Sequence, residues 1–301
     1  MRVTTERRAF ALIALSALAL IWGDNWVVMK IAVRDASPFV FAAWRTFGGG
    51  VVLAIAGLLL RRPMRPRYFG QVFWIGLFQT AGFVGLAMWA VVTAGAGAVA
   101  MLAYTMPLWV ALIAWPVLGE RIGALQAIAL ALAFAGIALM IGPLHAAAAA
   151  DFIALGAGLS WAIGIVLAKR LHHRESIDVF SLTMWQMLCG GAVLVVVALL
   201  VPSHPTVWTH TYVFALAYNV FIATALAYTL FLFVLSVLPA GVTSMGTLAN
   251  PIVGVLAGWL QLGEVPGKRE AIGMILIVAA LIAVGSAPAK PHRIADDEQT
   301  R

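Results

Sequence analysis

Charged residues are scarce in this sequence. Only 10% of its 301 residues are Asp, Glu, Lys or Arg, whereas 63% are hydrophobic and the mean hydropathy is +1.00. Soluble domains carry about 25% charged residues, so this composition excludes a water-soluble globular protein. Long polar segments are scarce as well, which leaves no room for a separate extramembrane domain. The sequence predicts an integral membrane protein.

Cysteine and catalytic motifs are also scarce. Cys189 is the single cysteine, so no intrachain disulfide can form, and the phosphate-binding pattern GxxxxGK[ST] does not occur. An intramembrane enzyme needs a Ser/His pair, two aspartates or a metal set inside the spans, but every histidine falls in a predicted loop or tail. These are His145, His172, His173, His204, His210 and His292. The sequence therefore disfavours an enzyme and predicts no metal or other cofactor.

Long apolar runs fill most of the chain, and each is long enough to cross a hydrocarbon core of about 30 Å as a helix. Runs such as residues 127–142 are apolar on every face, which excludes the alternating strands of a barrel. We expect an all-α protein with ten transmembrane helices, a cytoplasmic N-terminus at 1–8 and a disordered tail at 288–301. The expected spans are 9–33, 37–60, 68–92, 95–118, 122–142, 150–169, 178–200, 210–236, 240–262 and 270–287.

The basic residues predict the orientation. The formal net charge is +7, but the Lys and Arg residues lie in loops beside the spans, where they meet anionic lipid rather than nucleic acid. Most fall on the side of the N-terminus, including the segment RRPMRPR at residues 61–67. By the positive-inside rule both termini are cytoplasmic. We expect a multi-pass protein of the cell inner membrane.

The two halves of the chain resemble each other. Residues 102–120, LAYTMPLWVALIAWPVLGE, match residues 246–264, GTLANPIVGVLAGWLQLGE, with the proline and the final Gly-Glu in register. This predicts a first five-helix repeat at 9–142 and a second at 150–287. Because five is odd, the second repeat must cross the membrane in the opposite sense, and such inverted repeats are typical of secondary transporters.

Three motifs carry a family resemblance: WGDN at residues 22–25, and a proline followed at equal spacing by LGE in helices four and nine. With them the chain resembles the drug/metabolite transporter superfamily, EamA type. The segment YTMPLW and the aromatic-rich spans are most similar to bacterial exporters of aromatic amino acids, although that family commonly has serine where this chain has Asp24.

The resemblance implies export of small amphiphilic metabolites, aromatic or other neutral amino acids foremost, across the inner membrane by alternating access. The partners are then the bilayer and a small-molecule substrate. Efflux of lipophilic drugs and exchange of phosphorylated sugars, as in other branches of the superfamily, are the alternatives. A phosphate-bearing substrate would call for several basic residues at mid-membrane, and only Arg45 qualifies.

Asp24 and Arg45 are the two charged residues expected deep within spans, about 9 Å and about 10 Å from the same boundary. Each would cost about 2.5–3.5 kcal/mol near the membrane centre, so we expect them to be paired or to serve function. Three interpretations are open: a fixed salt bridge between helices one and two, the two ends of a site for a zwitterion, or proton uptake by Asp24.

Pro107 and Pro251 are expected to kink helices four and nine, with Tyr104 and Asn250 beside the kinks. The alternative is a packing kink with locally satisfied polar groups. Further candidates for a cavity lining are polar or aromatic residues at mid-span. They are Asn25, Gln79, Thr80, Trp161, Trp185, Gln186, Thr224 and Tyr228. Rings among them could stack on an aromatic substrate, or pack within the protein.

Two further features await the structure. Glu120 and Glu264 end helices four and nine near Arg121 and near Lys268 and Arg269, where they could act as gates or merely fix helix ends. Gly156, Ser160 and Gly164 form a seam of small residues, suited to contact between helices or between the two protomers of a homodimer.

Overall fold

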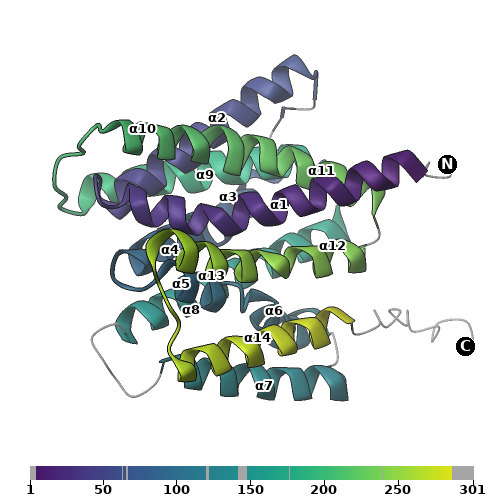
Figure 1. Ribbon diagram of the computed structural model, residues 1–301. Helices are drawn as coiled ribbons and strands as arrows, with labels where there is room; N and C mark the ends of the chain where they lie inside the picture. The colour runs from purple at the N-terminus through teal and green to yellow at the C-terminus, as the bar shows by residue number, and fades with distance from the viewer. Residues whose placement is uncertain are drawn as a thin grey trace, which may run out of the picture.

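The protein is a bundle of helices (Figure 1). The structure, a computed structural model, describes residues 5–62, 64–65, 67–119, 122–141, 148–175, 177–238 and 240–286. The helices are α1 (Thr5–Ala32), α2 (Pro38–Leu59), α3 (Phe69–Ile75), η1 (Gly76–Gly82), α4 (Phe83–Thr93), α5 (Ala96–Ala103), α6 (Met106–Leu118), α7 (Ala124–Ile141), α8 (Ala148–Arg174), α9 (Val179–Leu200), α10 (His210–Ala217), η2 (Tyr218–Leu226), α11 (Ala227–Val237), α12 (Ala240–Thr247), α13 (Ala249–Leu262) and α14 (Lys268–Ser286). Within these residues no strand occurs, and the predicted all-α class is confirmed.

Eight helical stretches are long and apolar enough to cross a membrane, and α13 is a shorter apolar helix. Three of the eight join consecutive elements: α3 to α4 through η1, α5 to α6, and α10 to α11 through η2. Large apolar side chains such as Leu59, Leu199 and Leu260 are about four-fifths exposed on the outer surface, where a bilayer would cover them. The chain is a multi-pass membrane protein.

Two of the expected spans are interrupted just before a proline. Tyr104 and Thr105 separate α5 from α6, and Leu248 separates α12 from α13. Pro107 and Pro251 therefore lie in the first turn of the following helix, where the backbone N–H that proline lacks would have no helical partner. At each proline the expected kink is a short interruption of one or two residues between two helices.

Two other spans contain a π-helical turn instead of a continuous α-helix: η1 holds Gln79 and Thr80, and η2 holds Asn219 and Thr224. The wider π turn displaces side chains around the helix and is frequent at functional sites. No sequence signal used above predicts these segments.

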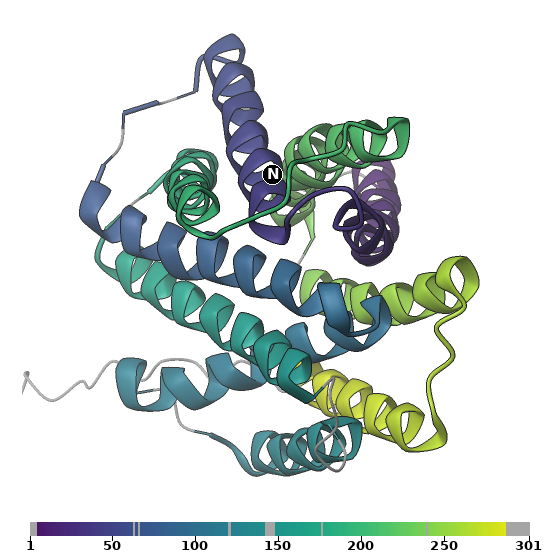
Figure 2. The same ribbon diagram turned by 90° about the vertical axis from the view of Figure 1, so that its left-hand side faces the viewer.

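The helices pack as a central bundle with a pair at its edge. α1 packs along α13 and α11, α8 packs along α6 and α4, and α2 lies against α9. α7 and α14 pack on each other, and in both views they form one edge of the molecule (Figures 1 and 2). Helices from the first and second halves of the chain thus interleave throughout the bundle.

Small residues allow the closest helix crossings. A Cβ at Gly164 would lie 2.4 Å from the Gln79 Cβ, and the Ser160 hydroxyl donates to the Phe78 carbonyl at 2.7 Å. Two members of the seam of small residues on α8 therefore face α3–η1 within the same chain. Of the two interpretations of the seam, this structure favours contact between helices.

Replacing Gly164 with Ala should destabilise the protein by about 1–3 kcal/mol, because the added methyl collides with Gln79 backbone atoms that cannot move away. Gly156→Ala on the same helix is the matched control, since its nearest contact would be an ordinary 3.7 Å. Thermal unfolding in detergent measures both. Equal melting temperatures for the two variants would contradict the described α8–η1 packing.

Candidate functional site

The two helix breaks are joined by a buried hydrogen bond. Asn250 Nδ2, in the first turn of α13, donates to Tyr104 Oη, in the break between α5 and α6, at 2.9 Å. Asn250 is 1% exposed, and its Oδ1 has no hydrogen-bond partner among the described residues. The break residues predicted from sequence therefore meet, and one buried acceptor remains available between them.

A chain of aromatic rings leads away from Tyr104. The Trp26 ring on α1 lies 6.2 Å from the Tyr104 ring and 6.5 Å from Phe83 on α4, centre to centre. Phe83 in turn meets Trp161 on α8 at 4.8 Å. Sequence reasoning proposed Tyr104 and Trp161 but missed Trp26 and Phe83, because neither stands out among many aromatic residues in apolar runs.

Arg45 carries a charge that no carboxylate within the described residues neutralises. Its Nη1 donates to the Met29 sulfur at 2.8 Å, and its buried Nε has no partner there. The Tyr228 hydroxyl interacts electrostatically with both Arg45 and Tyr104. We call Arg45, Tyr104, Tyr228, Asn250 and Trp26 the central cluster.

Trp22 supports the Tyr228 side of this cluster. Its ring lies 5.6 Å from Tyr228 and 5.5 Å from Phe231, centre to centre. Its Nε1 donates to the Ala223 carbonyl in η2 at 2.9 Å. The π turn thus supplies an acceptor for a tryptophan that sequence reasoning used only as a marker of the repeat.

Of the three interpretations of Asp24 and Arg45, the fixed salt bridge between helices one and two does not form in this structure. Asp24 Oδ1 accepts a hydrogen bond from Gln261 on α13, whereas Arg45 contacts Met29. Five residues along α1 turn Met29 about 140° around the helix from Asp24, so the two charges meet different faces of α1. Asp24 forms no ion pair with any residue that the structure describes.

Other predicted polar residues are buried within the helix bundle. Asn25 on α1 is 5% exposed, and its Oδ1 has no partner among the described residues. Gln79 and Thr80 lie buried on η1, and Gln186 lies buried on α9. Sequence reasoning missed Asn219 in η2, which is fully buried with an unpartnered Oδ1. The sequence signal that could have identified Asn219 is a single amide side chain within an apolar run.

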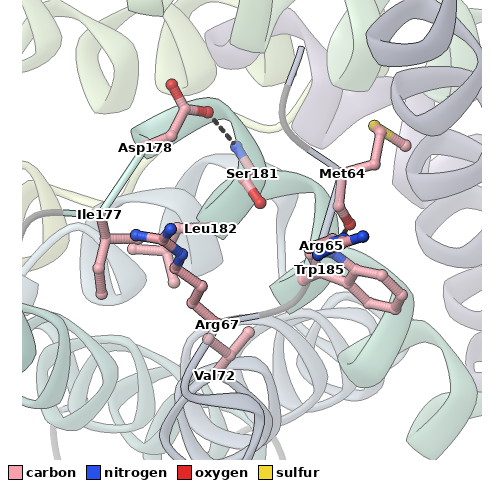
Figure 3. A pocket seen from close by; sticks show the side chains of 9 residues that line it. All are labelled: Met64, Arg65, Arg67, Val72, Ile177, Asp178, Ser181, Leu182 and Trp185. Carbon is pink, nitrogen blue, oxygen red and sulfur yellow. Dashed lines mark hydrogen bonds between the residues drawn. The ribbon is translucent and has the colours of Figure 1, made fainter.

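Trp185 and the two glutamates have other neighbours. Trp185 Nε1 donates to the Met64 carbonyl at 2.9 Å, and the residue lines a separate cavity near the start of α9 (Figure 3). Glu264 pairs with Lys30 at 3.8 Å, not with Lys268 or Arg269 as the sequence suggested. Glu120 lies outside the described residues.

Lys30 connects several helix ends around that pair. Its Nζ donates to the carbonyls of Val91 and Ala94 at 3.2 Å and 2.5 Å, at the end of α4. Glu264 Oε2 also accepts from the Gly97 N–H at the start of α5, at 3.4 Å. One ion pair thus ties together α1, α4, α5 and the end of α13.

Comparison with known proteins identifies the family of this chain. The model of the EamA-like transporter family matches the chain twice, over residues 9–142 and 148–286. The chain belongs to the EamA-like transporter family. This assigns it to the drug/metabolite transporter superfamily, as the motifs predicted, and membership indicates a membrane transporter rather than an enzyme.

Relatives in the family match over nearly the whole chain. The uncharacterized transporter YoaV of Bacillus subtilis is 25% identical, covering 90% of this chain and 94% of its own. The uncharacterized inner membrane transporter YedA of Escherichia coli K12 is 29% identical, covering 92% of each. A crystal structure of a chain 19% identical superposes with a TM-score of 0.65 over 92% of this chain and 97% of that one, which shows a shared fold.

The Tyr104–Asn250 bond should contribute a measurable coupling between the two helix breaks. We expect Tyr104→Phe and Asn250→Leu, combined in a double-mutant cycle, to show a coupling of about 0.5–1.5 kcal/mol in unfolding free energy. Reversible unfolding in detergent gives the four stabilities required. Strictly additive effects would mean that the two side chains are not bonded in the folded protein.

Proposed function

We propose that this EamA-like protein is a secondary transporter that exports small amphiphilic metabolites, aromatic and other neutral amino acids foremost, across the bacterial inner membrane. The observation that carries the proposal is the half-buried Arg45, whose buried Nε has no partner and whose guanidinium meets no carboxylate among the described residues. A charge at such depth is costly unless a counter-ion reaches it, and a substrate carboxylate would supply one.

The rings around the central cluster suit the remainder of such a substrate. Trp26, Phe83 and Trp161 present faces and edges from three helices, and Tyr228 lies on the Arg45 side. Edge and face contacts with an aromatic side chain contribute about 0.5–1.5 kcal/mol each beyond their buried area. The unpartnered Asn250 Oδ1 offers an acceptor for the substrate ammonium group.

Asp24 is proposed to couple transport to protons. It is half-buried on α1, its described hydrogen-bond partner is the neutral amide of Gln261, and no cation pairs with it among the described residues. The Gln261 amide can donate to a carboxyl oxygen whether or not the carboxyl group carries a proton.

The architecture proposed for this activity is ten spans in two inverted five-helix repeats, with both termini cytoplasmic. Support comes from the double match of the family model and from paired features in the two halves. Each half has one π segment, one broken helix, and one helix ended by a glycine of left-handed conformation, Gly119 at φ 71° and Gly263 at φ 68°. Such duplicated units can rock against each other around a midplane site.

The Lys30–Glu264 pair is proposed to be the gate at one end. There, α5 and α13 pack against each other, whereas the described residues of α6 and α12 show no comparable packing at the opposite end. In the repeat, Lys30 and Glu264 correspond to Lys169 and Glu120. We therefore propose that Lys169 and Glu120 are the gate residues of the opposite end.

Counterflow tests the substrate and Arg45, and uptake under an imposed proton gradient tests Asp24. Proteoliposomes preloaded with unlabelled phenylalanine should accumulate radiolabelled phenylalanine without an ion gradient. Arg45→Gln should reduce the rate to that of empty liposomes, because the carboxylate loses its counter-ion. Asp24→Asn should keep counterflow, which needs no net proton movement, but should lose uptake driven by an imposed proton gradient while the protein still inserts. Arg34→Gln is the matched control. It removes an exposed arginine just after the end of α1 and should transport normally.

Normal counterflow by Arg45→Gln would refute the role assigned to Arg45, and normal proton-driven uptake by Asp24→Asn would refute the role assigned to Asp24. Absence of counterflow in folded wild-type protein would exclude phenylalanine as a substrate, and would redirect the search to lipophilic drugs and sugar phosphates under an imposed proton gradient.

Cross-linking tests the gate. In a Cys189→Ala background, Lys30→Cys with Glu264→Cys should react with a short bismaleimide, and the cross-linked protein should lose counterflow because that end can no longer open. Each single-cysteine variant treated with the same reagent controls for modification alone. Lys169→Cys with Glu120→Cys should respond in the same way. Full transport by protein cross-linked between positions 30 and 264 would rule out the gate.

A further inference from the structure

A cavity of about 600 Å³ lies apart from the central cluster, between the segment that follows α2 and the start of α9 (Figure 3). Its lining combines two arginines with apolar side chains. It consists of Met64, Arg65, Arg67, Val72, Ile177, Asp178, Ser181, Leu182 and Trp185. Phe69 and Val179, beside the cavity, are about half exposed on the outer surface, so the cavity lies where α3 and α9 enter the apolar layer.

The two arginines are not neutralised by the protein. Neither Arg65 nor Arg67 forms an ion pair or hydrogen bond with another described residue. The one acidic residue of the lining, Asp178, caps α9 by accepting the Ser181 N–H at 2.8 Å. Figure 3 shows the Arg67 side chain extending toward Ile177 and Leu182, and Arg65 beside Trp185. The cavity therefore presents net positive charge.

The segment that forms one wall is held in place at several points. Trp185 Nε1 bonds the Met64 carbonyl, and the Phe69 ring lies 6.2 Å from the Trp185 ring. The Tyr68 hydroxyl donates to Glu175 beyond the end of α8, and this bond raises the pKa of Tyr68. Tyr68 itself has a φ of 56°, a left-handed conformation that is unfavourable for a residue with a Cβ. The described residues of this wall thus contact α9 and the end of α8.

We propose that this cavity binds an anionic phospholipid, with its phosphate at Arg65 and Arg67 and its glycerol and first methylenes against Leu182 and Trp185. Arginine pairs with phosphate by charge-assisted hydrogen bonds, and basic pockets between transmembrane helices are suited to acidic headgroups. The orientation proposed above places this site in the cytoplasmic leaflet, whose anionic lipids would supply the ligand. The site is independent of the transported substrate.

Thermal unfolding in neutral detergent with added short-chain lipid tests the proposal. Dioctanoyl phosphatidylglycerol should raise the melting temperature by several degrees, and dioctanoyl phosphatidylcholine should not. The double variant Arg65→Gln/Arg67→Gln should lose the shift. Arg61→Gln/Arg62→Gln removes the same charge from the same segment outside the cavity, and should keep it.

A second variant separates the cavity from the surface charge. Leu182→Trp retains both arginines but fills part of the cavity, so it should also lose the shift. A retained shift in Leu182→Trp, or equal losses in the two arginine double variants, would mean that the lipid binds the basic surface and would overturn the proposal. An equal shift with inorganic phosphate or glycerol phosphate would overturn it as well, in favour of a soluble phosphate ligand.

Discussion

Water is absent from the core of a bilayer, so each polar group buried there needs a partner in the protein or in a ligand. This constraint accounts for several of the side-chain hydrogen bonds in the structure. Tyr104 and Asn250 bond each other where two helices break, Trp22 bonds a carbonyl within a π turn, and Ser160 bonds the carbonyl of Phe78. Arg45 differs from these groups, because its described partner is a thioether that carries no charge.

The interruptions and the buried polar groups belong together. A continuous α-helix satisfies its own backbone and presents little polarity to its neighbours, whereas a break or a π turn frees backbone groups and redirects side chains. Tyr104, Asn250 and Asn219 all lie at such positions. The proposed transport site therefore lies where helical regularity is lost, and the tightly packed glycine contacts around it hold those irregular segments in place.

Composition and the length of the apolar runs were sufficient to predict the helical class and the membrane location, because both follow from transfer free energies that add along the chain. The prolines located the helix breaks, and the repeated motif identified the family. Side-chain partners were harder to predict. The sequence places Asp24 and Arg45 at a similar depth in the membrane. In the structure, however, Asp24 and the Met29 contact of Arg45 lie on different faces of α1. Glu264 pairs with Lys30, which is far from it in the sequence, so no local pattern predicts the contact.

The central claim is that Arg45 recognises a substrate carboxylate, and the most direct measurement varies the ligand rather than the protein. Binding of phenylalanine and of phenethylamine, which lacks the carboxylate, can be compared by titration calorimetry on purified protein. The account predicts that phenylalanine binds and that phenethylamine binds at least tenfold more weakly, since a lost charged contact costs about 1.5–3 kcal/mol. Equal affinities would contradict it.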